Sequence, residues 1–436
     1  MKARVLTLLL LFLSPLLFSQ YKPWFNFYNF TYGAKARAMG NAFAAVADDL
    51  TAAFWNPAGL AAQRSPEFYL SYKSLSQAHD YDLQDRILLN ETKLYNYNFS
   101  SQLNQIDFFS VSVPAVIWQR NWTFALSYYR YIPYGLKGSA REVITYLHDR
   151  FDPQKNTVAF TGSEGIDVLA FSASAALSTH FALGATLQQF FDSGSQHLST
   201  EISNREYHSQ FSEKLQGRNL IAGLLFSPFD FLRLGVTWHS GLKNNFDSTL
   251  LTWEVNRKGD KVNQLEVSCL ARVVIPEQVA LGALLRPAAW LDLSAEYSRL
   301  DWEKGTIENY YDFDTVLPYP QKDNFGKKQQ NIRNLRFGVE ARMPLRHWRL
   351  HLRGGWSAER QLYADVNDQA VEIIGQSAGL GCEFSRNLLL EIAYQRQKAD
   401  WPEKGYFIKA PDVASHFRAN VFNLSLTYRF GHIFKE

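Results

Sequence analysis

The sequence predicts an all-β protein, a transmembrane antiparallel β-barrel of about fourteen strands with an N-terminal plug inside its lumen. Aromatic residues make up 15% of the 436 residues, yet the mean hydropathy is only −0.24. After residue 20 the chain lacks any run of about twenty apolar residues, the length that a membrane-spanning helix needs. Many segments instead alternate polar and apolar residues, and tight turns between them alternate with long polar links.

Residues 1–20 are predicted to form a secretory signal peptide. Met1 to Arg4 is a short positively charged stretch, and the Leu-rich run from Val5 to Phe18 is too short for a comfortable membrane span. We therefore expect export of the mature chain. The net charge of +3, without a run of Lys or Arg, does not indicate nucleic-acid binding.

Alternation with a period of two is the main strand signal. Trp122, Phe124 and Leu126, for example, interleave with Thr123 and Ala125. In other segments charged residues oppose a strongly apolar face; they are Asp292, Glu296, Arg336, Glu340, Arg342, Arg349 and Arg353. A soluble sandwich would need a second sheet to cover such apolar faces. In a membrane barrel they face lipid, while the charges pair in a wet lumen.

The order of strands and links predicts the orientation of the barrel. We expect strands at 66–75, 105–118, 122–133, 166–178, 181–191, 218–227, 231–241, 271–286, 290–301, 332–343, 348–357, 374–384, 388–398 and 417–430. Tight turns join alternate pairs, and the long polar links are 76–104, 134–165, 192–217, 242–270, 302–331, 358–373 and 399–416. Short turns at one rim and long loops at the other are typical of bacterial outer-membrane barrels, whose short turns are periplasmic.

The predicted plug is an Ala- and Gly-rich segment, assigned to residues 21–65, and the barrel is assigned to residues 66–436. Small side chains allow a backbone to approach the wall of a crowded lumen closely. Gly33, Gly40, Pro57 and Gly59 would interrupt a long helix, which argues against an Ala-rich helix of a soluble domain. Asn56 is expected to support the turn at Pro57 by local hydrogen bonds.

Charged residues of the same segment are expected to pair with charges of the wall. The acidic residues are Asp48 and Asp49, and the basic residues are Lys35, Arg37 and Arg64.

The plug residues resemble the N-terminal hatch of the FadL/TodX superfamily, outer-membrane transporters of long-chain fatty acids and hydrophobic compounds. The residues that carry the resemblance are Gly33, Gly40, Asp48, Asp49, Asn56, Pro57, Ala58 and Gly59. A second stretch, from Ile275 to Trp302, resembles a strand pair of the same superfamily. With the strand count, the resemblance covers essentially the whole mature chain.

The resemblance implies passive transport of hydrophobic small molecules, most of all long-chain fatty acids, with hydrocarbons as the other ligand class. Extracellular loops would capture the ligand, a pocket in the barrel would hold it, and a wall gap at a kink in the third strand would release it sideways. Here the third strand runs into Pro133, Tyr134 and Gly135. Proline cannot donate to the strand ladder and glycine tolerates a bend, so a gap fits these residues. An ordinary strand end is the alternative.

Outer-membrane lipid and the barrel assembly machinery are the other implied partners, and no cofactor or metal is expected. The sequence contains no nucleophile elbow, HExxH motif or P-loop, so enzyme activity is not predicted.

A second branch with a similar hatch leaves one alternative open. The sequences at 45–49 and 54–61 are also close to those of PorV-type barrels, which act as components of protein secretion and surface attachment. A continuous apolar tunnel that ends in a wall gap would favour transport. A blocked lumen with a broad exposed loop surface would favour interaction with secretion-system proteins.

Overall fold

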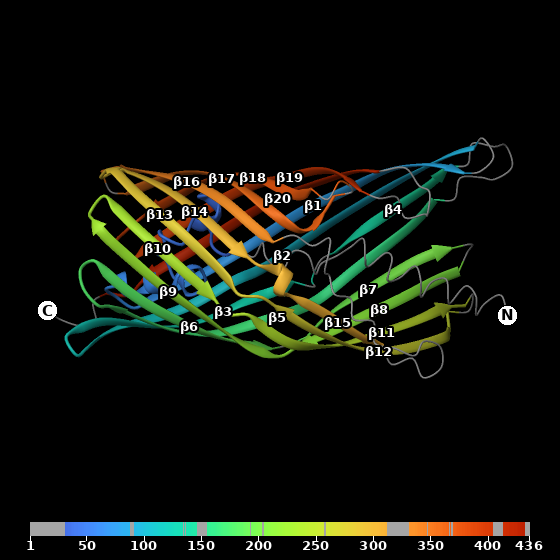
Figure 1. Ribbon diagram of the computed structural model, residues 1–436, viewed down its shortest axis with the longest axis horizontal. Helices are drawn as coiled ribbons and strands as arrows, with labels where there is room; N and C mark the ends of the chain where they lie inside the picture. Colours follow the sequence, from blue (N-terminus) through green and yellow to red (C-terminus); the bar gives the residue numbers. More distant parts are fainter. Residues whose placement is uncertain are drawn as a thin grey trace.

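The computed structural model describes residues 31–431, except 88–90, 134, 136, 146–154, 192, 203–204, 257–258, 312–330, 347, 366, 368 and 404–412. The predicted signal peptide, the first residues of the predicted plug and Tyr134 lie outside these residues. The strands form one antiparallel sheet that closes into a barrel (Figure 1). Closure is seen at β1 (Glu67–Ile87), which pairs with β2 (Glu91–Ile117) on one side and with β20 (Val413–Arg429) on the other.

The remaining strands complete fourteen spans, as the sequence predicts. Six spans are interrupted, and each consists of two labelled strands: β3 with β4, β6 with β7, β8 with β9, β10 with β11, β12 with β13, and β14 with β15. The bounds are β3 (Arg120–Pro133), β4 (Lys137–Thr145), β5 (Lys155–Ala176), β6 (Phe181–Phe191), β7 (Ser193–Ile202), β8 (Arg205–Leu215), β9 (Gly217–Phe229), β10 (Leu232–His239), β11 (Leu242–Val255), β12 (Lys261–Ile275), β13 (Gln278–Ala288), β14 (Leu291–Leu300), β15 (Thr306–Tyr311), β16 (Ile332–Pro344), β17 (Arg349–Ala364), β18 (Ala370–Glu383) and β19 (Leu388–Glu403).

The predicted alternation of faces is confirmed. Along β3, Leu126 is 46% exposed whereas Ser127 is fully buried, and along β16 Phe337 is 45% exposed whereas Arg336 is 3% exposed. Apolar side chains thus form the outer surface and polar ones face the lumen, the reverse of a soluble protein and the pattern of a barrel in lipid. No helix of the described chain has the length and hydropathy to cross a membrane.

The seven predicted long loops are wrong in part, because the strands continue through them. β1 and β2 extend through most of 76–104, β7 and β8 through 192–217, and β11 and β12 through 242–270. The other four predicted loops, 134–165, 302–331, 358–373 and 399–416, are also partly strand. With a rise of about 3.3 Å per residue, β2 is roughly 90 Å long, about three times the thickness of a bilayer core. The strands therefore extend well beyond the length that a bilayer core requires, at the end that Figure 1 shows on the right.

These extensions could not be recognised from the sequence pattern of lipid-facing strands. Backbone pairing with neighbouring strands defines them, so they lack the apolar alternation that marks a strand in lipid. The predicted strand 271–286 is also wrong as one strand, since it divides into β12 and β13 at Pro276. Proline has no N–H group to donate to the ladder.

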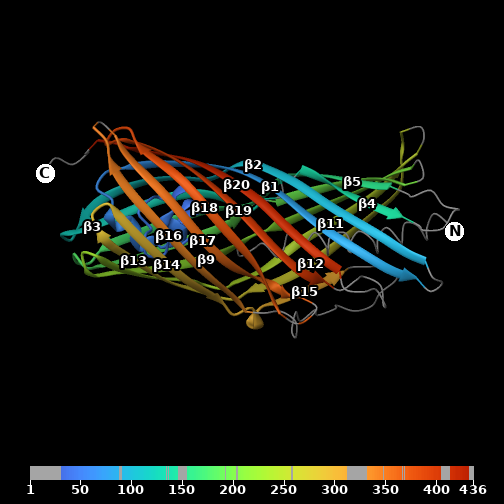
Figure 2. The ribbon, with the colours of Figure 1, turned by 90° about the horizontal axis from the view of Figure 1, so that it is seen from above.

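Residues 31–64, which we call the luminal segment, lie inside the barrel near its short-turn end (Figures 1 and 2). They form three short helices, α2 (Ala34–Ala38), α3 (Ala52–Trp55) and the 3-10 helix η2 (Pro57–Ala62). The segment contacts strands around the lumen. Its backbone bonds Ser425 of β20 at 2.9 Å, Ser377 of β18 at 3.1 Å and Thr237 of β10 at 2.9 Å. The division of the chain into signal peptide, plug and barrel domains stays a prediction.

Candidate functional site

Glycines in the wall allow the luminal segment to lie directly against the backbone of the strands. A Cβ at Gly184 would lie 2.3 Å from the carbonyl carbon of Pro57, and one at Gly355 would lie 2.0 Å from the nitrogen of Gly40. Any larger residue would have to displace the segment at these points. Six of the wall glycines form three pairs across adjacent strands, namely Gly184 with Gly223, Gly235 with Gly282, and Gly338 with Gly355.

Each glycine pair receives a different part of the luminal segment. Residues 56–57 lie over the first pair, 44–45 over the second, and 39–40 over the third. The segment is therefore seated at three separate places around the lumen. Its position depends on close shape complementarity at all three places, because the wall glycines have no side chain of their own there.

The predicted hatch glycines occupy constrained positions. Gly33 and Gly40 have φ of 87° and 64°, a left-handed conformation that favours glycine. A Cβ at Gly59 would lie 1.8 Å from the carbonyl oxygen of Ala47, so this glycine permits the luminal segment to fold against itself. Ala58, next to it, is buried in η2.

Asn56 connects the luminal segment to itself and to the wall. Its Nδ2 donates to the carbonyl oxygen of Ala44 at 2.7 Å and to that of Leu224 in β9 at 3.2 Å. Its Oδ1 accepts from the backbone nitrogen of Ala58 at 3.2 Å, which caps η2 at Pro57. The side chain is fully buried, so its removal would leave these carbonyl oxygens without that donor.

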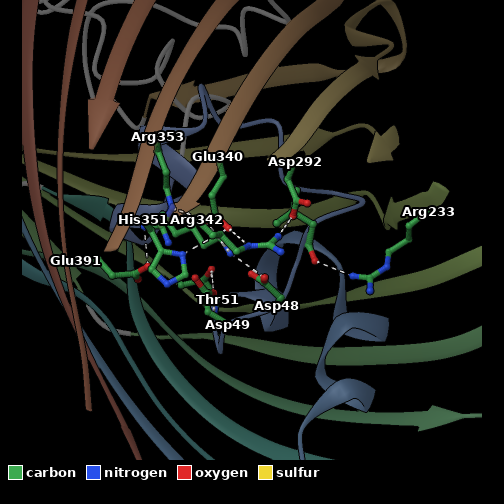
Figure 3. A network of polar contacts seen from close by, with 12 residues as sticks. Asp48, Asp49, Thr51, Arg233, Asp292, Glu340, Arg342, His351, Arg353 and Glu391 are labelled. Atoms are coloured by element: carbon green, nitrogen blue, oxygen red, sulfur yellow. Dashed lines mark hydrogen bonds and ion pairs between the residues drawn. The ribbon is translucent and has the colours of Figure 1, made fainter. Parts of the chain in front are cut away.

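An ion-pair network joins the luminal segment to β16, β17 and β19 (Figure 3). The Nζ atom of Lys35 lies 2.7 Å from Oδ2 of Asp48 and 3.4 Å from Oε2 of Glu340. Arg353 contacts the same Glu340 oxygen through Nε at 2.6 Å and Glu391 through Nη1 at 2.7 Å. Asp48 is partly exposed, but the side chains of Glu340, Arg353 and Glu391 are each about 1% exposed, so breaking one of their pairs would leave a buried charge without a partner.

Asp49 lies beside this network but pairs with no cation in the described chain. Its Oδ1 accepts from the backbone nitrogen of Thr51 at 2.8 Å, and its Oδ2 has no hydrogen-bond partner among the described residues. Burial, together with the nearby charge of Glu391, raises the pKa of the Asp49 carboxyl to about 7.

The expectation that the charges of the segment pair with wall charges is thus met only by Lys35. Arg37 instead bonds the wall amides Asn423 and Gln395, the latter at 2.8 Å. Arg64 bonds backbone oxygens of its own segment, at 3.5 and 3.3 Å. In a closely packed lumen, neutral amides satisfy a guanidinium without a second buried charge.

A cavity of about 50 Å³ lies between the luminal segment and the wall. A water needs roughly 10–15 Å³, so the cavity has room for a few waters and a larger ligand would displace lining side chains. The lining mixes aromatic, aliphatic and polar groups: Phe54, Trp55, Tyr131, Gln188, Asn219, His239, Ser240, Ile275, Pro276, Gln278, Ala280, Glu296, Leu300 and Arg336.

The charged part of the cavity lining is Glu296 on β14 and Arg336 on β16, and Arg336 also contacts Glu359 on β17, which does not line the cavity. Arg336 donates through Nη1 to Oε1 of Glu296 at 2.7 Å and through Nε to Oε1 of Glu359 at 3.4 Å. The other oxygen of Glu296 accepts from the backbone nitrogens of Phe43 and Ala44, at 2.8 and 2.7 Å. Glu296 therefore holds both the cavity arginine and the luminal segment.

The hydrogen-bond ladder is interrupted between β2 and the span made of β3 and β4. The β2–β3 ladder ends at Phe108 opposite Tyr129, and the β2–β4 ladder begins at Gln102 opposite Lys137. Between these points, the described residues of 103–107 and 130–135 are not paired across this boundary. Pro133 ends β3, and Gly135 lies within the break, where its Cβ would be 3.5 Å from Cδ1 of Leu103.

An aromatic cluster separates the gap from the lumen. The hydroxyl of Tyr32, in the luminal segment, donates to the carbonyl oxygen of Arg130 at the edge of the gap, at 3.0 Å. The Tyr32 ring lies 4.9 Å from Tyr129, 5.5 Å from Phe108 and 4.8 Å from Phe54, which also lines the cavity. The cavity and the gap are therefore neighbours across a thin layer of aromatic rings.

Solved structures with the same arrangement identify the class of barrel. No protein-family model matches the sequence, and no curated protein matches it. The chain shares the fold of the FadL-type transporters: a Pseudomonas aeruginosa FadL homologue is similar over 90% of this chain and 96% of its own, with 17% identity and a TM-score of 0.60.

Two toluene transporters have the same fold. TbuX of Ralstonia pickettii covers 92% of this chain and 98% of its own length at 14% identity, with a TM-score of 0.57. TodX of P. putida covers 92% of this chain and 99% of its own length at 14% identity, with a TM-score of 0.59. The predicted resemblance to the FadL/TodX superfamily is thus confirmed for the fold.

The sequence did not reveal the wall glycines or Glu359. A pairing such as Gly338 with Gly355 depends on strand register, which is not visible in a single sequence. Glu359 lies in the predicted loop 358–373, although its alternation with Ser357 places both on the luminal face of one longer strand.

Proposed function

We propose that this protein is an outer-membrane channel for the passive passage of hydrophobic compounds, which leave the barrel sideways through the gap between β2 and β3. The interruption of the ladder at 130–135, beside an aromatic cluster and a cavity, is the observation that carries this proposal. A lateral exit delivers an apolar molecule into the hydrocarbon of the bilayer, and the partition of its apolar surface supplies the free energy.

The seating of the luminal segment supports a sideways route. The segment lies against glycine pairs on three parts of the wall, so an axial path at this level would require it to move. The gap lies beside the rings of Tyr32 and Tyr129, which would have to rotate for a ligand to pass from the cavity. On the proposed route, a ligand enters at the projecting end of the barrel, passes through the cavity and the aromatic cluster, and leaves through the gap into the bilayer.

The substrate class is proposed from the same features. Long-chain fatty acids are the substrates that the sequence resemblance predicts, and hydrocarbons are the other class. That two proteins with this fold are described as toluene transporters supports apolar cargo in general. We propose the bacterial outer membrane as the location, with membrane lipid and the barrel assembly machinery as partners.

A pair of glycine variants tests the lateral exit. In Gly135→Phe the new side chain is directed at Leu103 and fills the gap, whereas Gly354→Phe adds the same ring to the wall near Val339, where a Cβ would be 3.5 Å from the nearest atom. We expect Gly135→Phe to slow uptake of a radiolabelled hydrophobic compound by cells, while binding to the purified barrel is retained. Gly354→Phe is expected to behave as the wild type.

Equal uptake by the two variants would contradict a lateral exit at this gap. Absence of any hydrophobic binding, together with co-purifying secretion-system proteins, would instead favour the PorV-type alternative, which stays a prediction.

A further inference from the structure

An ion pair joins β3 to β5 beside the gap between β2 and β3. Arg130 of β3 and Asp167 of β5 lie directly opposite each other in the ladder. Nε and Nη2 of Arg130 donate to the two carboxylate oxygens of Asp167 at 2.8 and 2.9 Å, a bidentate arrangement. The hydroxyl of Tyr128 donates to the same carboxylate. Asp167, whose side chain is 3% exposed, is therefore held by two side chains of β3.

The alternation of the two strands places this ion pair on the outside of the barrel. Arg130 shares a face of β3 with Leu126, which is 46% exposed, and Asp167 shares a face of β5 with Leu169, which is 44% exposed. The ten residues from 120 to 130 rise about 33 Å along β3, which at a strand tilt of about 40° is roughly 25 Å across the membrane, the height of a barrel's apolar band. The ion pair therefore lies at the edge of this band, next to the gap.

A glycine of β5 makes room for the arginine. A Cβ at Gly165 would lie 2.9 Å from Cδ and 3.1 Å from Nε of Arg130, so the arginine side chain crosses the wall at a point where β5 has no side chain. A larger residue there would displace the guanidinium from Asp167.

The ion pair is adjacent to a bulge in β3. Arg130 and Ile132 pair with consecutive residues of β5, so Tyr131 between them is an extra residue. A bulge bends its strand and redirects a side chain, and here the side chain of Tyr131 lines the cavity. Beyond the bulge β3 stays paired with β5 as far as Pro133, whereas its ladder with β2 has already ended at Tyr129. At this point β3 therefore follows β5 and leaves β2.

Arg130 also contacts the luminal segment, through its backbone. Its carbonyl oxygen accepts the hydroxyl of Tyr32 at 3.0 Å, while its side chain is held on the outer face by Asp167. Without the ion pair the bulge would be free to straighten. The edge of β3 at 130–133 would then meet the edge of β2 at 103–107, and open strand edges pair readily.

We propose that Arg130, Asp167 and Tyr128 form a clasp that keeps the gap open by fastening the bulged edge of β3 to β5. Arg130 is in this sense a positioning residue for the lateral exit. The inference rests on the proposed transport function and deepens it, because it names the contacts on which the exit depends.

Two variants and a control test the clasp. Asp167→Asn removes the charge with little change of shape, and Tyr128→Phe removes only one donor to the same carboxylate. The control, Glu372→Gln, breaks the pair with Arg360 at 2.7 Å, which also joins directly opposite residues of neighbouring strands, β17 and β18, that do not border the gap. Uptake of radiolabelled oleate and toluene by cells, and binding of both probes to the purified barrel, are measured for each.

We expect Asp167→Asn to slow uptake about tenfold, the factor that loss of a charge-assisted bond permits, and to leave binding unchanged. Hydrogen exchange should become slower at 103–107 and 130–132, because closure of the gap pairs their free amides. A merely structural role would make exchange at these residues faster. Combining Arg130→Asp with Asp167→Arg reverses the charges of the pair and should recover most of the lost uptake. Tyr128→Phe should slow uptake less than Asp167→Asn, and Glu372→Gln should match the wild type.

Three outcomes would overturn the clasp while leaving the transport function intact. They are wild-type uptake by Asp167→Asn, faster exchange at the edges of the gap in that variant, and an equal loss of uptake in Glu372→Gln. If Asp167→Asn does not assemble, Tyr128→Phe decides, and wild-type uptake and exchange in this variant would overturn the clasp. If the wild-type protein neither binds the two probes nor increases their uptake, the proposed function fails, and the clasp with it.

Discussion

The substitution Gly355→Ala tests whether the luminal segment is seated by backbone contact with wall glycines. The added Cβ would lie 2.0 Å from the nitrogen of Gly40 and 2.4 Å from the carbonyl carbon of Met39, both in the backbone of the segment. Neither atom belongs to a flexible side chain, so the segment itself has to move. Gly354 is the matched control, because a Cβ there would have 3.5 Å to its nearest neighbour.

The size of the effect follows from the displacement. Ordinary contact begins near 3.4 Å, so Gly40 would have to move by about 1.4 Å from the 2.0 Å position. That movement would break the bond from Gly40 nitrogen to Ser377 Oγ and the bond from this hydroxyl to Ala38 oxygen, both 3.1 Å long. With about 1 kcal/mol for each bond and about 1–3 kcal/mol for overpacking, we expect roughly 3–5 kcal/mol.

Hydrogen exchange followed by mass spectrometry measures this loss locally. In Gly355→Ala, amides of residues 36–44 should exchange at least about a hundredfold faster than in the wild type, while the strands of the barrel keep their protection. Gly354→Ala should match the wild type, and it controls for the propensity change of placing alanine in a strand. Equal protection of residues 36–44 in the two variants would refute the seating of the segment on glycine.

Two further substitutions probe other contacts of the luminal segment. Asn56→Ala removes the donor to the carbonyl oxygens of Ala44 at 2.7 Å and Leu224 at 3.2 Å. We expect the luminal segment to lose about 2 kcal/mol of stability, which would appear as faster hydrogen exchange at residues 52–60. Unchanged exchange would contradict the anchoring role of Asn56. Asp49 has a pKa of about 7 in the folded chain against 3.8 for a free carboxyl, so the folded state favours its protonated form. Stability of the segment should then be greatest below about pH 4, fall as the pH rises to about 7 and level off above it, as monitored by thermal unfolding. Asp49→Asn should abolish this contribution, and an identical pH profile in the variant would show that Asp49 is not its source.

The sequence predicted the spans in lipid well because a single physical rule governs them. A strand between lipid and water must alternate apolar and polar residues, and segments such as Trp122 to Tyr128 or Leu291 to Tyr297 follow that rule closely. The same rule does not apply to the parts of the wall that lie outside the lipid-facing belt. The strands β7, β8 and β11 and most of β12 therefore lie in segments that the sequence predicts to be loops.

The candidate site was predictable only where it depends on local residues. The left-handed conformations of Gly33 and Gly40, the turn at Pro57 and the break at Pro133 each follow from the residue itself. Contacts between distant strands could not be foreseen. The Glu296–Arg336 pair and the three glycine pairs require a strand register that only the folded barrel defines.

Photo-crosslinking tests the lateral route most directly. A fatty alcohol that carries a diazirine on its chain is irradiated with the wild-type barrel in lipid bilayers, and the labelled peptides are mapped by mass spectrometry. The lateral route predicts labelling of luminal residues at the cavity, such as Phe54, and of both edges of the gap, at Leu103 and at 130–135. In Gly135→Phe, the labelling at the gap should be lost. Labelling confined to the lipid-facing belt, at residues such as Leu126 and Phe337, would contradict it.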